Sequence, residues 1–322
     1  MTDNEFLLYD RTEKIKSVIS QYGEENFFVS FSGGKDSTVL HYLVDMAIPN
    51  NSIPRVYADT GIELNMIRDF VYEMKKNDDR IEIITPSSPI KPMLENEGYP
   101  FKSKLHSDFV MRYRRNGLEL KGIRSYLGME DTRSGKPISR PCPKKLMYQF
   151  TDDFNLKVSD MCCKKLKTQP IAEWKKRNNK KYGILGIMRS EGGRRGRAQC
   201  LAFRQGKLLN FQPMAPLTKE WEEWFIDEYK IPICDIYYPP YNFERTGCKG
   251  CPFAIHLQEQ LDTLEEFFPN ERKQCEYIWG PVYEEYRRIG YRLRKEEKQE
   301  DEQIEGQMSI FDFMDAETEE ST

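Results

Sequence analysis

Residues 27–38, FFVSFSGGKDST, place a glycine-rich turn and several anion-binding residue types directly after an apolar segment. Residues 27–31 predict a strand and residues 36–47 a helix, so the turn leads into a helix N-terminus. We expect both glycines to adopt positive φ and to let a ligand approach the backbone, where free N–H groups favour phosphate. The candidate phosphate-binding residues are Ser32, Gly33, Gly34, Lys35, Asp36 and Ser37, of which Lys35 and Asp36 are also candidate catalytic residues.

This turn differs from a Walker A loop, because Val29 stands where that motif has its first glycine and Asp36 follows the lysine. SFSGGKDS instead resembles the PP-loop of the ATP pyrophosphatase superfamily, which holds the pyrophosphate end of ATP or a related adenylate. The segment RVYADTGIE (55–63) resembles a strand end of sulfonucleotide reductases. The resemblance implies nucleotide contacts for Asp59 and Thr60, whereas Asp59 alone could also be a helix N-cap.

Strand and helix patterns alternate through the first part of the chain. Strands are predicted at 27–31, 55–58 and 81–84, helices at 36–47 and 62–75, and a further strand at 182–188. Alternation of this kind predicts an α/β fold with a parallel sheet and helices on both faces. The resemblance makes the expected fold Rossmann-like, of the adenine nucleotide alpha hydrolase type, with a helical cysteine-rich C-terminal part and a disordered acidic tail.

We expect a nucleotide-binding domain at 1–215 with a basic insertion at about 105–160, a helical region at 216–295 that completes the cysteine cluster, and a disordered tail at 296–322. Thr218 is a candidate N-cap for the helix that begins the second region. The tail contains eleven acidic residues and one lysine, which is typical of a disordered segment.

The net charge of −3 conceals an excess of positive charge outside the tail, where 48 Lys and Arg residues stand against 41 Asp and Glu residues. Basic patches occur at 112–124, 174–181 and 189–197, and they indicate either an ordinary solvated surface or a site for an anionic substrate, a nucleotide or a nucleic acid. The third patch follows a predicted strand, which makes Arg189 and Arg194 candidate phosphate or sulfate ligands. The chain has no membrane-length apolar run and no signal-peptide pattern at its N-terminus, so we expect a cytoplasmic protein.

Four of the eight cysteines form two pairs. Cys162 and Cys163 are adjacent, and Cys248 and Cys251 form a Cys-x-x-Cys motif, with 84 residues between the two pairs. Four thiolates can hold zinc or an iron–sulfur cluster. The pattern resembles that of assimilatory APS reductases, which implies a 4Fe–4S cluster; zinc is the alternative.

Cys275 is compared with the catalytic cysteine that reductases of this family carry in a C-terminal Glu-Cys-Gly-x-His segment. Cys275 lies at a comparable distance beyond Cys251, but its context, ERKQCEYIW, lacks the glycine and the histidine. We therefore expect a core cysteine, with a nucleophilic role as the alternative.

These features give three hypotheses. The first is a PP-loop enzyme that binds ATP with Mg²⁺ beside an iron–sulfur cluster and modifies a nucleic acid with sulfur. The second is reduction of APS or PAPS to sulfite with a thiol donor. The third is a non-catalytic iron–sulfur module that senses a nucleotide and docks on a DNA sliding clamp.

The tail contributes to the third hypothesis. The residues Gln307, Met308, Ser309, Ile310 and Phe311 resemble the bacterial sliding-clamp motif Gln-Leu-Ser/Asp-Leu-Phe. Apolar residues in an otherwise acidic segment are often anchors that become ordered on binding. The alternatives are a chance match and docking of the segment on the protein itself.

Overall fold

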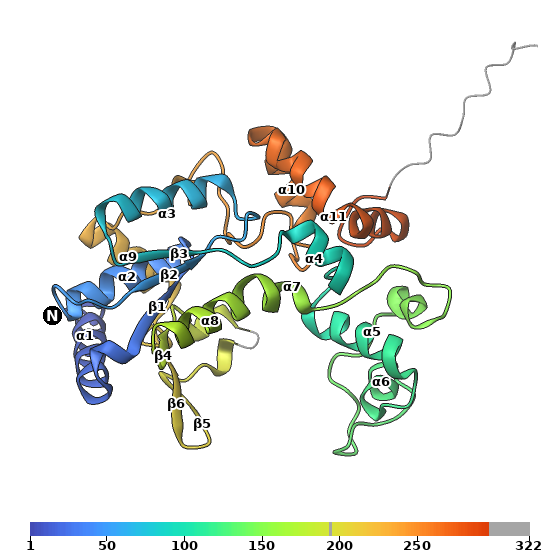
Figure 1. Cartoon of the computed structure of the whole chain (residues 1–322), viewed down its shortest axis with the longest axis horizontal. Helices are drawn as coiled ribbons and strands as arrows, with labels where there is room; N and C mark the ends of the chain where they lie inside the picture. Colours follow the sequence, from blue (N-terminus) through green and yellow to red (C-terminus); the bar gives the residue numbers. More distant parts are fainter. Residues whose placement is uncertain (193–194, 296–322) are drawn as a thin grey trace, which may run out of the picture.

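A six-stranded sheet forms the centre of the nucleotide-binding part in the computed structural model, which describes residues 1–192 and 195–295 (Figure 1). The strand order is β3-β2-β1-β4-β6-β5, and only β5 is antiparallel to its neighbour. The strands are β1 (Phe27–Phe31), β2 (Arg55–Ala58), β3 (Ile81–Ile84), β4 (Tyr182–Ile184), β5 (Leu201–Arg204) and β6 (Lys207–Phe211). The predicted strands at 27–31, 55–58 and 81–84 are confirmed, and the strand predicted at 182–188 ends at residue 184.

Helices cover both faces of the sheet, as predicted. Alternate residues of β1 point to opposite faces: Val29 belongs to the core under the helices of one face, whereas Phe28 packs on Trp174 with 5.5 Å between ring centroids. The first face carries α1 (Asp3–Tyr22), α2 (Lys35–Ala47), α3 (Asn65–Asn77) and α9 (Lys219–Tyr229), and the second carries α8 (Gln169–Arg177).

A second apolar core lies beside the sheet and joins segments from residues 62–166 and 234–293. Its helices are α4 (Ile90–Glu97), α5 (Lys104–Asn116), α6 (Lys121–Tyr126), α7 (Met161–Cys163), α10 (Leu257–Phe267) and α11 (Pro269–Ile289). The region predicted as an insertion is thus helical and shares its core with the C-terminal helices. The remaining short helical turns are Glu24–Asn26, Lys144–Phe150, Lys164–Thr168, Arg189–Glu191, Arg195–Arg197 and Asp235–Tyr237.

The topology creates a crevice where ligands are expected. From β1 the chain continues outward through β2 and β3 and then returns to form β4 on the other side of β1. In open α/β sheets, ligands bind at the carboxyl ends of the two strands at such a reversal. The glycine-rich turn follows β1, and residues 185–192 follow β4, so both lie at this point.

Three sequence predictions fall outside the described residues: the phosphate-binding role of Arg194, the disorder of the tail at 296–322 and the clamp motif at 307–311. The division of the chain at residue 215 stays a prediction. Within the ranges that the structure describes, no helix is both long and apolar enough to cross a membrane.

Candidate functional site

The turn after β1 has different conformations at its two glycines. Gly33 has a φ of 70°, and a Cβ there would come within 2.4 Å of Val71, so this position requires glycine. Gly34 is the N-cap of α2 with a φ of −78°, so the expectation of positive φ at Gly34 is wrong. A side chain at Gly34 would instead meet the Tyr237 hydroxyl at 3.1 Å. Gly34 is therefore a position of close approach.

Hydroxyl groups stabilise the turn from inside. The Ser37 hydroxyl accepts a hydrogen bond from the Ser32 N–H at 3.1 Å and donates to the Gly34 carbonyl at 2.9 Å, and Thr38 donates to the same carbonyl at 3.0 Å. These bonds fix the N-terminus of α2, and the helix dipole there favours a bound anion.

The turn opens into a cavity of about 670 Å³. Ser32, Gly34, Lys35, Asp36 and Ser37 of the predicted site line it, whereas Gly33 does not. The other walls come from distant segments: Met188, Glu191, Arg195, Lys219, Glu222, Glu223, Tyr237 and residues 242–247. The last segment runs directly into Cys248, so one stretch of backbone connects the cavity to the cysteines.

The ammonium group of Lys35 lies at the wall of the cavity. Its Nζ lies 2.6 Å from Glu223 Oε1 and 5.5 Å from the centre of the Tyr237 ring, and its backbone N–H donates to the Tyr237 hydroxyl at 3.2 Å. The Tyr237 hydroxyl is also hydrogen-bonded to Thr246. This arrangement places a cation within reach of a phosphate bound at the N-terminus of α2.

Three carboxyl groups converge on the same wall. Burial, and then the neighbouring Glu191, raises the pKa of Asp36, while burial and the charge of Asp36 raise the pKa of Glu222 to about 9. The Oε1 atom of Glu222 is buried and has no hydrogen-bond partner among the described residues. Carboxylates beside a phosphate site repel an anion unless a cation lies between them, and hard oxygen ligands suit Mg²⁺. A magnesium ion that accompanies a nucleotide stays a prediction, because Glu191 is paired with Arg195 and Arg245. Within residues 1–192 and 195–295, the three carboxyl groups also do not place their oxygens within 4.8 Å of one another.

The positive charges from the patch at 189–197 are arranged differently from the prediction. Arg189 is exposed and donates from Nε to the Ala215 carbonyl at 3.2 Å, and it does not line the cavity. Arg195 does line it, and its guanidinium pairs with Glu191 and lies 4.0 Å from Asp36. Arg245 also pairs with Glu191, at 3.2 Å.

Asp59 is hydrogen-bonded to its own turn and to the following helix α3. Its carboxylate accepts hydrogen bonds from the Gly61 N–H at 3.1 Å, the Arg68 Nε at 3.0 Å and the Tyr72 hydroxyl at 2.9 Å. Asp59 and Thr60 are both buried, and neither lines the cavity. The nucleotide contacts predicted for them stay predictions.

The end of β2 supports the cysteine site. The Thr60 N–H and hydroxyl donate to Glu63 at 3.0 and 2.8 Å, and Glu63 pairs with Lys167 at 3.0 Å. Although burial alone would lower the pKa of Lys167, the negative charges of Cys248 and Glu63 raise it above its usual range. The backbones of Glu63 and Cys248 also form an antiparallel bridge. These contacts connect the turn at 164–168, which follows α7, and the end of β2 to the Cys-x-x-Cys turn.

The structure brings the four predicted ligand cysteines together. Cys162 and Cys163 lie on α7, and the neighbouring thiols affect each other's ionisation: a hydrogen bond between them raises the pKa of Cys162 and lowers that of Cys163 to about 6. Burial raises the pKa of Cys248 to about 11, and burial and the nearby Cys248 thiol raise that of Cys251 to about 12. All four sulfurs thus share one electrostatic environment.

The identity of a group bound by these sulfurs stays a prediction. Within residues 1–192 and 195–295, no three of the sulfurs lie within 4.8 Å of one another. Zinc–sulfur bonds of about 2.3 Å would hold tetrahedral ligands roughly 3.8 Å apart. The four thiols are buried or half-buried, and the 4Fe–4S cluster and the alternative of zinc both stay predictions.

The Cys-x-x-Cys turn is packed against α11. Gly250 has a φ of 59°, and a Cβ there would lie 2.4 Å from the Tyr283 hydroxyl and 2.7 Å from Cys275 Sγ. Lys249 forms a buried ion pair with Glu271 at 2.9 Å. Cys275 is fully buried in this contact, and burial raises its pKa to about 12. This position disfavours a nucleophilic role and agrees with the expected core cysteine.

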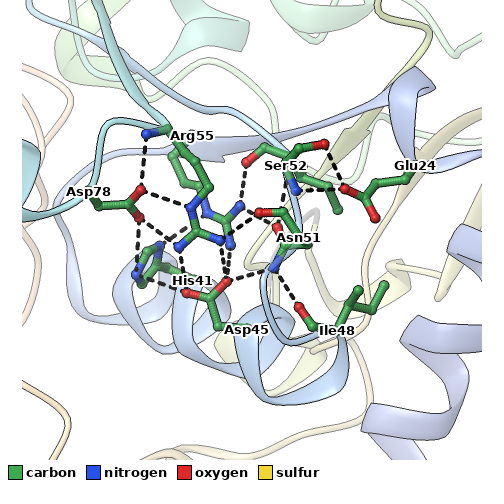
Figure 2. Close-up of polar contacts among 10 residues, drawn as sticks. Glu24, His41, Asp45, Ile48, Asn51, Ser52, Arg55 and Asp78 are labelled. Atoms are coloured by element: carbon green, nitrogen blue, oxygen red, sulfur yellow. Dashed lines mark hydrogen bonds and ion pairs between the residues drawn. The ribbon is translucent and has the colours of Figure 1, made fainter.

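A separate polar cluster anchors α2 to β2 (Figure 2). His41, Asp45 and Asp78 place their ligand atoms within 4.8 Å of one another, which is a metal-like spacing. However, Arg55 donates to Asp45 at 2.6 Å, and Arg80 donates to both carboxylates at 2.8 Å. The two guanidinium groups already neutralise the carboxylates, so the cluster stabilises the fold and does not need a cation.

Several cavity residues were missed from the sequence: Glu191, Arg195, Glu222, Tyr237, Arg245 and Thr246. Arg195 and Glu191 lie in the basic segment 189–197, from which only Arg189 and Arg194 were predicted as site residues, so the same signal could have identified them. Tyr237 and Thr246 reach the turn from about 200 residues away and carry no local motif.

The fold and the glycine-rich turn define a PP-loop nucleotide enzyme. A family model described as the phosphoadenosine phosphosulfate reductase domain matches residues 26–127 and 139–254, and the chain belongs to this family. Comparison with curated protein sequences finds no match.

Three solved structures resemble the chain at low identity. A phosphoadenylyl-sulfate (PAPS) reductase from Candida auris is 10% identical over 77% of this chain and 96% of its own, with a TM-score of 0.44. An NH3-dependent NAD synthetase from Campylobacter jejuni is 10% identical over 90% and 97%, with a TM-score of 0.39. The U34-tRNA thiolase NcsA from Methanococcus maripaludis, with its [4Fe-4S] cluster, is 12% identical over 87% and 79%, with a TM-score of 0.37. Because these scores are below 0.5, the fold assignment rests on the strand order and the family match.

Proposed function

We propose that the chain binds ATP with Mg²⁺ at the PP-loop, holds a 4Fe–4S cluster on its four paired cysteines and transfers sulfur to a nucleic acid. The observation that carries this proposal is the continuity of residues 242–251: their first part lines the phosphate cavity and their last part supplies two of the cysteines. A nucleotide and a sulfur-handling group would then act on one substrate from adjacent sites.

The cavity residues support cleavage of ATP between the α- and β-phosphates. An acceptor oxygen attacks the α-phosphorus, the bond to the β-phosphate oxygen breaks, and pyrophosphate leaves. Lys35 and the N–H groups at the start of α2 would stabilise the negative charge on the departing pyrophosphate. Asp36 and Glu222 would face a magnesium ion bound with the nucleotide, and that ion would offset charge on the same oxygens.

The second step would use the adenylate as a leaving group. A sulfur nucleophile attacks the activated atom of the acceptor, the bond to the adenylate oxygen breaks, and AMP leaves. The bound cluster would hold or deliver the sulfur. The fixed position of the cysteine turn, which Glu63, Lys249 and Tyr283 brace, would keep that sulfur beside the cavity.

The family match favours one alternative, reduction of a sulfonucleotide to sulfite. That reaction requires a thiolate that attacks the sulfonyl sulfur. Cys275, the cysteine at the expected distance, is fully buried with a raised pKa, which argues against this alternative.

The two reactions are separated by their products. Anaerobically purified protein should release pyrophosphate from ATP in the presence of a nucleic acid and a sulfide source, and the Lys35→Ala variant should not. Sulfite formation from APS or PAPS with a thiol donor, without pyrophosphate release from ATP, would instead support the reductase. A protein that binds nucleotide but forms neither product would favour a sensing role.

A further inference from the structure

Residues 102–150 form a helical lobe with an unusual charge. The segment contains twelve Lys and Arg residues against four Asp and Glu residues, a net charge of +8 in a chain whose net charge is −3. Figure 1 shows α5 and α6 of this lobe on the far side of α7 from the sheet. The lobe therefore concentrates positive charge away from the nucleotide cavity.

The helices that carry these charges are packed around a buried core. His106 lies at its centre, 2.9 Å from the Tyr126 hydroxyl and 2.8 Å from Gln149 Oε1, and Phe109 stacks on Tyr126 with 4.4 Å between ring centroids. Because these contacts join α5, α6 and the turn at 144–150, the cations on the outside have fixed relative positions.

Most of the lobe's cations lack a carboxylate partner. Within the described part of the chain, only Arg112 and Arg124 of the lobe pair with carboxylates, Asp108 and Glu130. Eight other cations are exposed and form no ion pair there: Arg114, Arg115, Lys121, Arg133, Lys136, Arg140, Lys144 and Lys145. Elsewhere, arginines such as Arg80 are neutralised by adjacent carboxylates. An exposed set of unneutralised cations is a surface for a polyanion.

The lobe lies directly against the cysteine site. The Lys102 N–H donates to the Tyr286 hydroxyl at 2.7 Å, and that hydroxyl donates to the carbonyl of Pro252 at 2.9 Å. Pro252 follows Cys251 in the chain. The start of the lobe is therefore connected to the segment that carries Cys248 and Cys251.

Part of this surface is not shared with the family model. The match stops at residue 127 and resumes at residue 139, so the segment that carries Arg133 and Lys136 lies outside it. The family model therefore does not account for these two charges.

We infer that the lobe binds the phosphate backbone of a nucleic acid and presents it to the cysteine site. Presentation of the nucleic acid to the cysteine site rests on the proposed function, whereas binding of the nucleic acid to the lobe does not. A nucleic acid carries one negative charge per phosphate along its length, which suits eight separated cations on several elements. Duplex DNA and folded RNA share this chemistry, and the experiment distinguishes them.

The test is the salt dependence of binding, measured by fluorescence anisotropy with the full-length, anaerobically prepared protein. Labelled duplex DNA and a labelled folded RNA hairpin are titrated between about 50 and 200 mM salt. The test variant combines Arg115→Gln, Arg133→Gln, Lys136→Gln and Lys144→Gln. We expect at least roughly tenfold weaker binding at low salt and a slope of log affinity against log salt that is smaller by about three to four, because each lost phosphate contact removes about 0.9.

A matched variant removes the same number of positive charges, four, from another part of the surface. Lys16→Gln, Arg204→Gln, Lys207→Gln and Lys230→Gln change exposed residues on the sheet side and should leave affinity and slope near the wild-type values. Equal losses in both variants would overturn the inference, as would wild-type protein that binds anionic lipid vesicles but neither nucleic acid.

ATP titration separates this inference from the proposed function. The lobe variant should bind ATP as the wild type does, which also shows that it is folded. Nucleic-acid binding through the lobe without any pyrophosphate release would contradict the proposed reaction and leave the lobe assignment intact.

Discussion

The charge of Lys35 is the strongest electrostatic feature that the PP-loop offers to a phosphate. Its Nζ is paired with Glu223 and lies beside the rings of Tyr237 and Tyr238. A nucleotide phosphate would replace or share the Glu223 carboxylate as the partner of this cation.

The Lys35→Ala variant should bind ATP about ten- to a hundredfold more weakly than the wild type, since loss of a charge-assisted contact costs about 1.5–3 kcal/mol. Isothermal titration with Mg²⁺ present measures this. The Glu223→Gln variant is the control, because it removes the ion pair and keeps the cation; it should bind ATP at least as well as the wild type. Unchanged affinity in Lys35→Ala would contradict the PP-loop assignment.

A second residue-scale prediction concerns His41 and acid stability. Burial and the charge of Arg55 lower the pKa of His41 from 6.5 to about 4. The unfolded chain therefore binds more protons than the folded chain between these values, and the free energy of unfolding falls as pH falls through this window. His41 contributes on the order of 3 kcal/mol to this fall in the free energy of unfolding once the pH is below both pKa values.

Urea unfolding at several pH values tests this linkage. The His41→Gln variant should lose less stability between pH 6.5 and about 4.5 than the wild type does, whatever its stability at neutral pH. His256→Gln, which changes an exposed histidine, should follow the wild-type profile. Parallel profiles for wild type and His41→Gln would mean that the folded protein protonates His41 normally.

At the scale of elements, the cysteine site joins α7 to the turn at 248–251, segments that are distant in sequence. A group bound there closes a long loop and couples metal binding to folding. Each of the substitutions Cys162→Ser, Cys163→Ser, Cys248→Ser and Cys251→Ser should therefore reduce bound iron and lower the thermal midpoint.

Anaerobic purification followed by iron and sulfide analysis measures this prediction. Wild-type protein should be brown and contain on the order of four irons per chain. Cys200→Ser, at a half-buried position on the sheet side, should retain the iron. Stoichiometric zinc in place of iron would show that the site holds a single ion.

Strands β1, β2 and β3 were predictable because they are short, largely apolar segments that lie in the interior of the sheet or against its helices. Strands β5 and β6, which carry exposed residues, were not predicted. The PP-loop was predictable because its chemistry is local to one turn. The rest of the cavity was not: Tyr237 and Glu222 reach the loop through long-range packing, which no local pattern encodes. Gly34 was assigned the wrong φ because the sequence does not show which of two adjacent glycines caps the helix.

For the whole molecule, three functional surfaces follow one another in space. The nucleotide cavity at the carboxyl edge of the sheet leads through residues 242–251 to the cysteines, and the cysteines adjoin the basic lobe through Tyr286. This order suits a reaction in which a bound polymer is activated at one site and modified at the next. It also raises the question of how the protein would reach DNA.

The clamp motif at 307–311, which lies outside the described residues, gives a testable answer. Ile310 and Phe311 would fill an apolar pocket and Gln307 would form a hydrogen bond at its rim, so a peptide of residues 303–316 should bind a bacterial sliding clamp at micromolar strength. Phe311→Ala should abolish binding, measured by surface plasmon resonance, because it removes the largest buried apolar group. Phe313→Ala removes the same side chain just outside the motif and should retain binding. If neither the peptide nor the full-length protein binds the clamp, the motif is a chance match and recruitment would depend on the basic lobe alone.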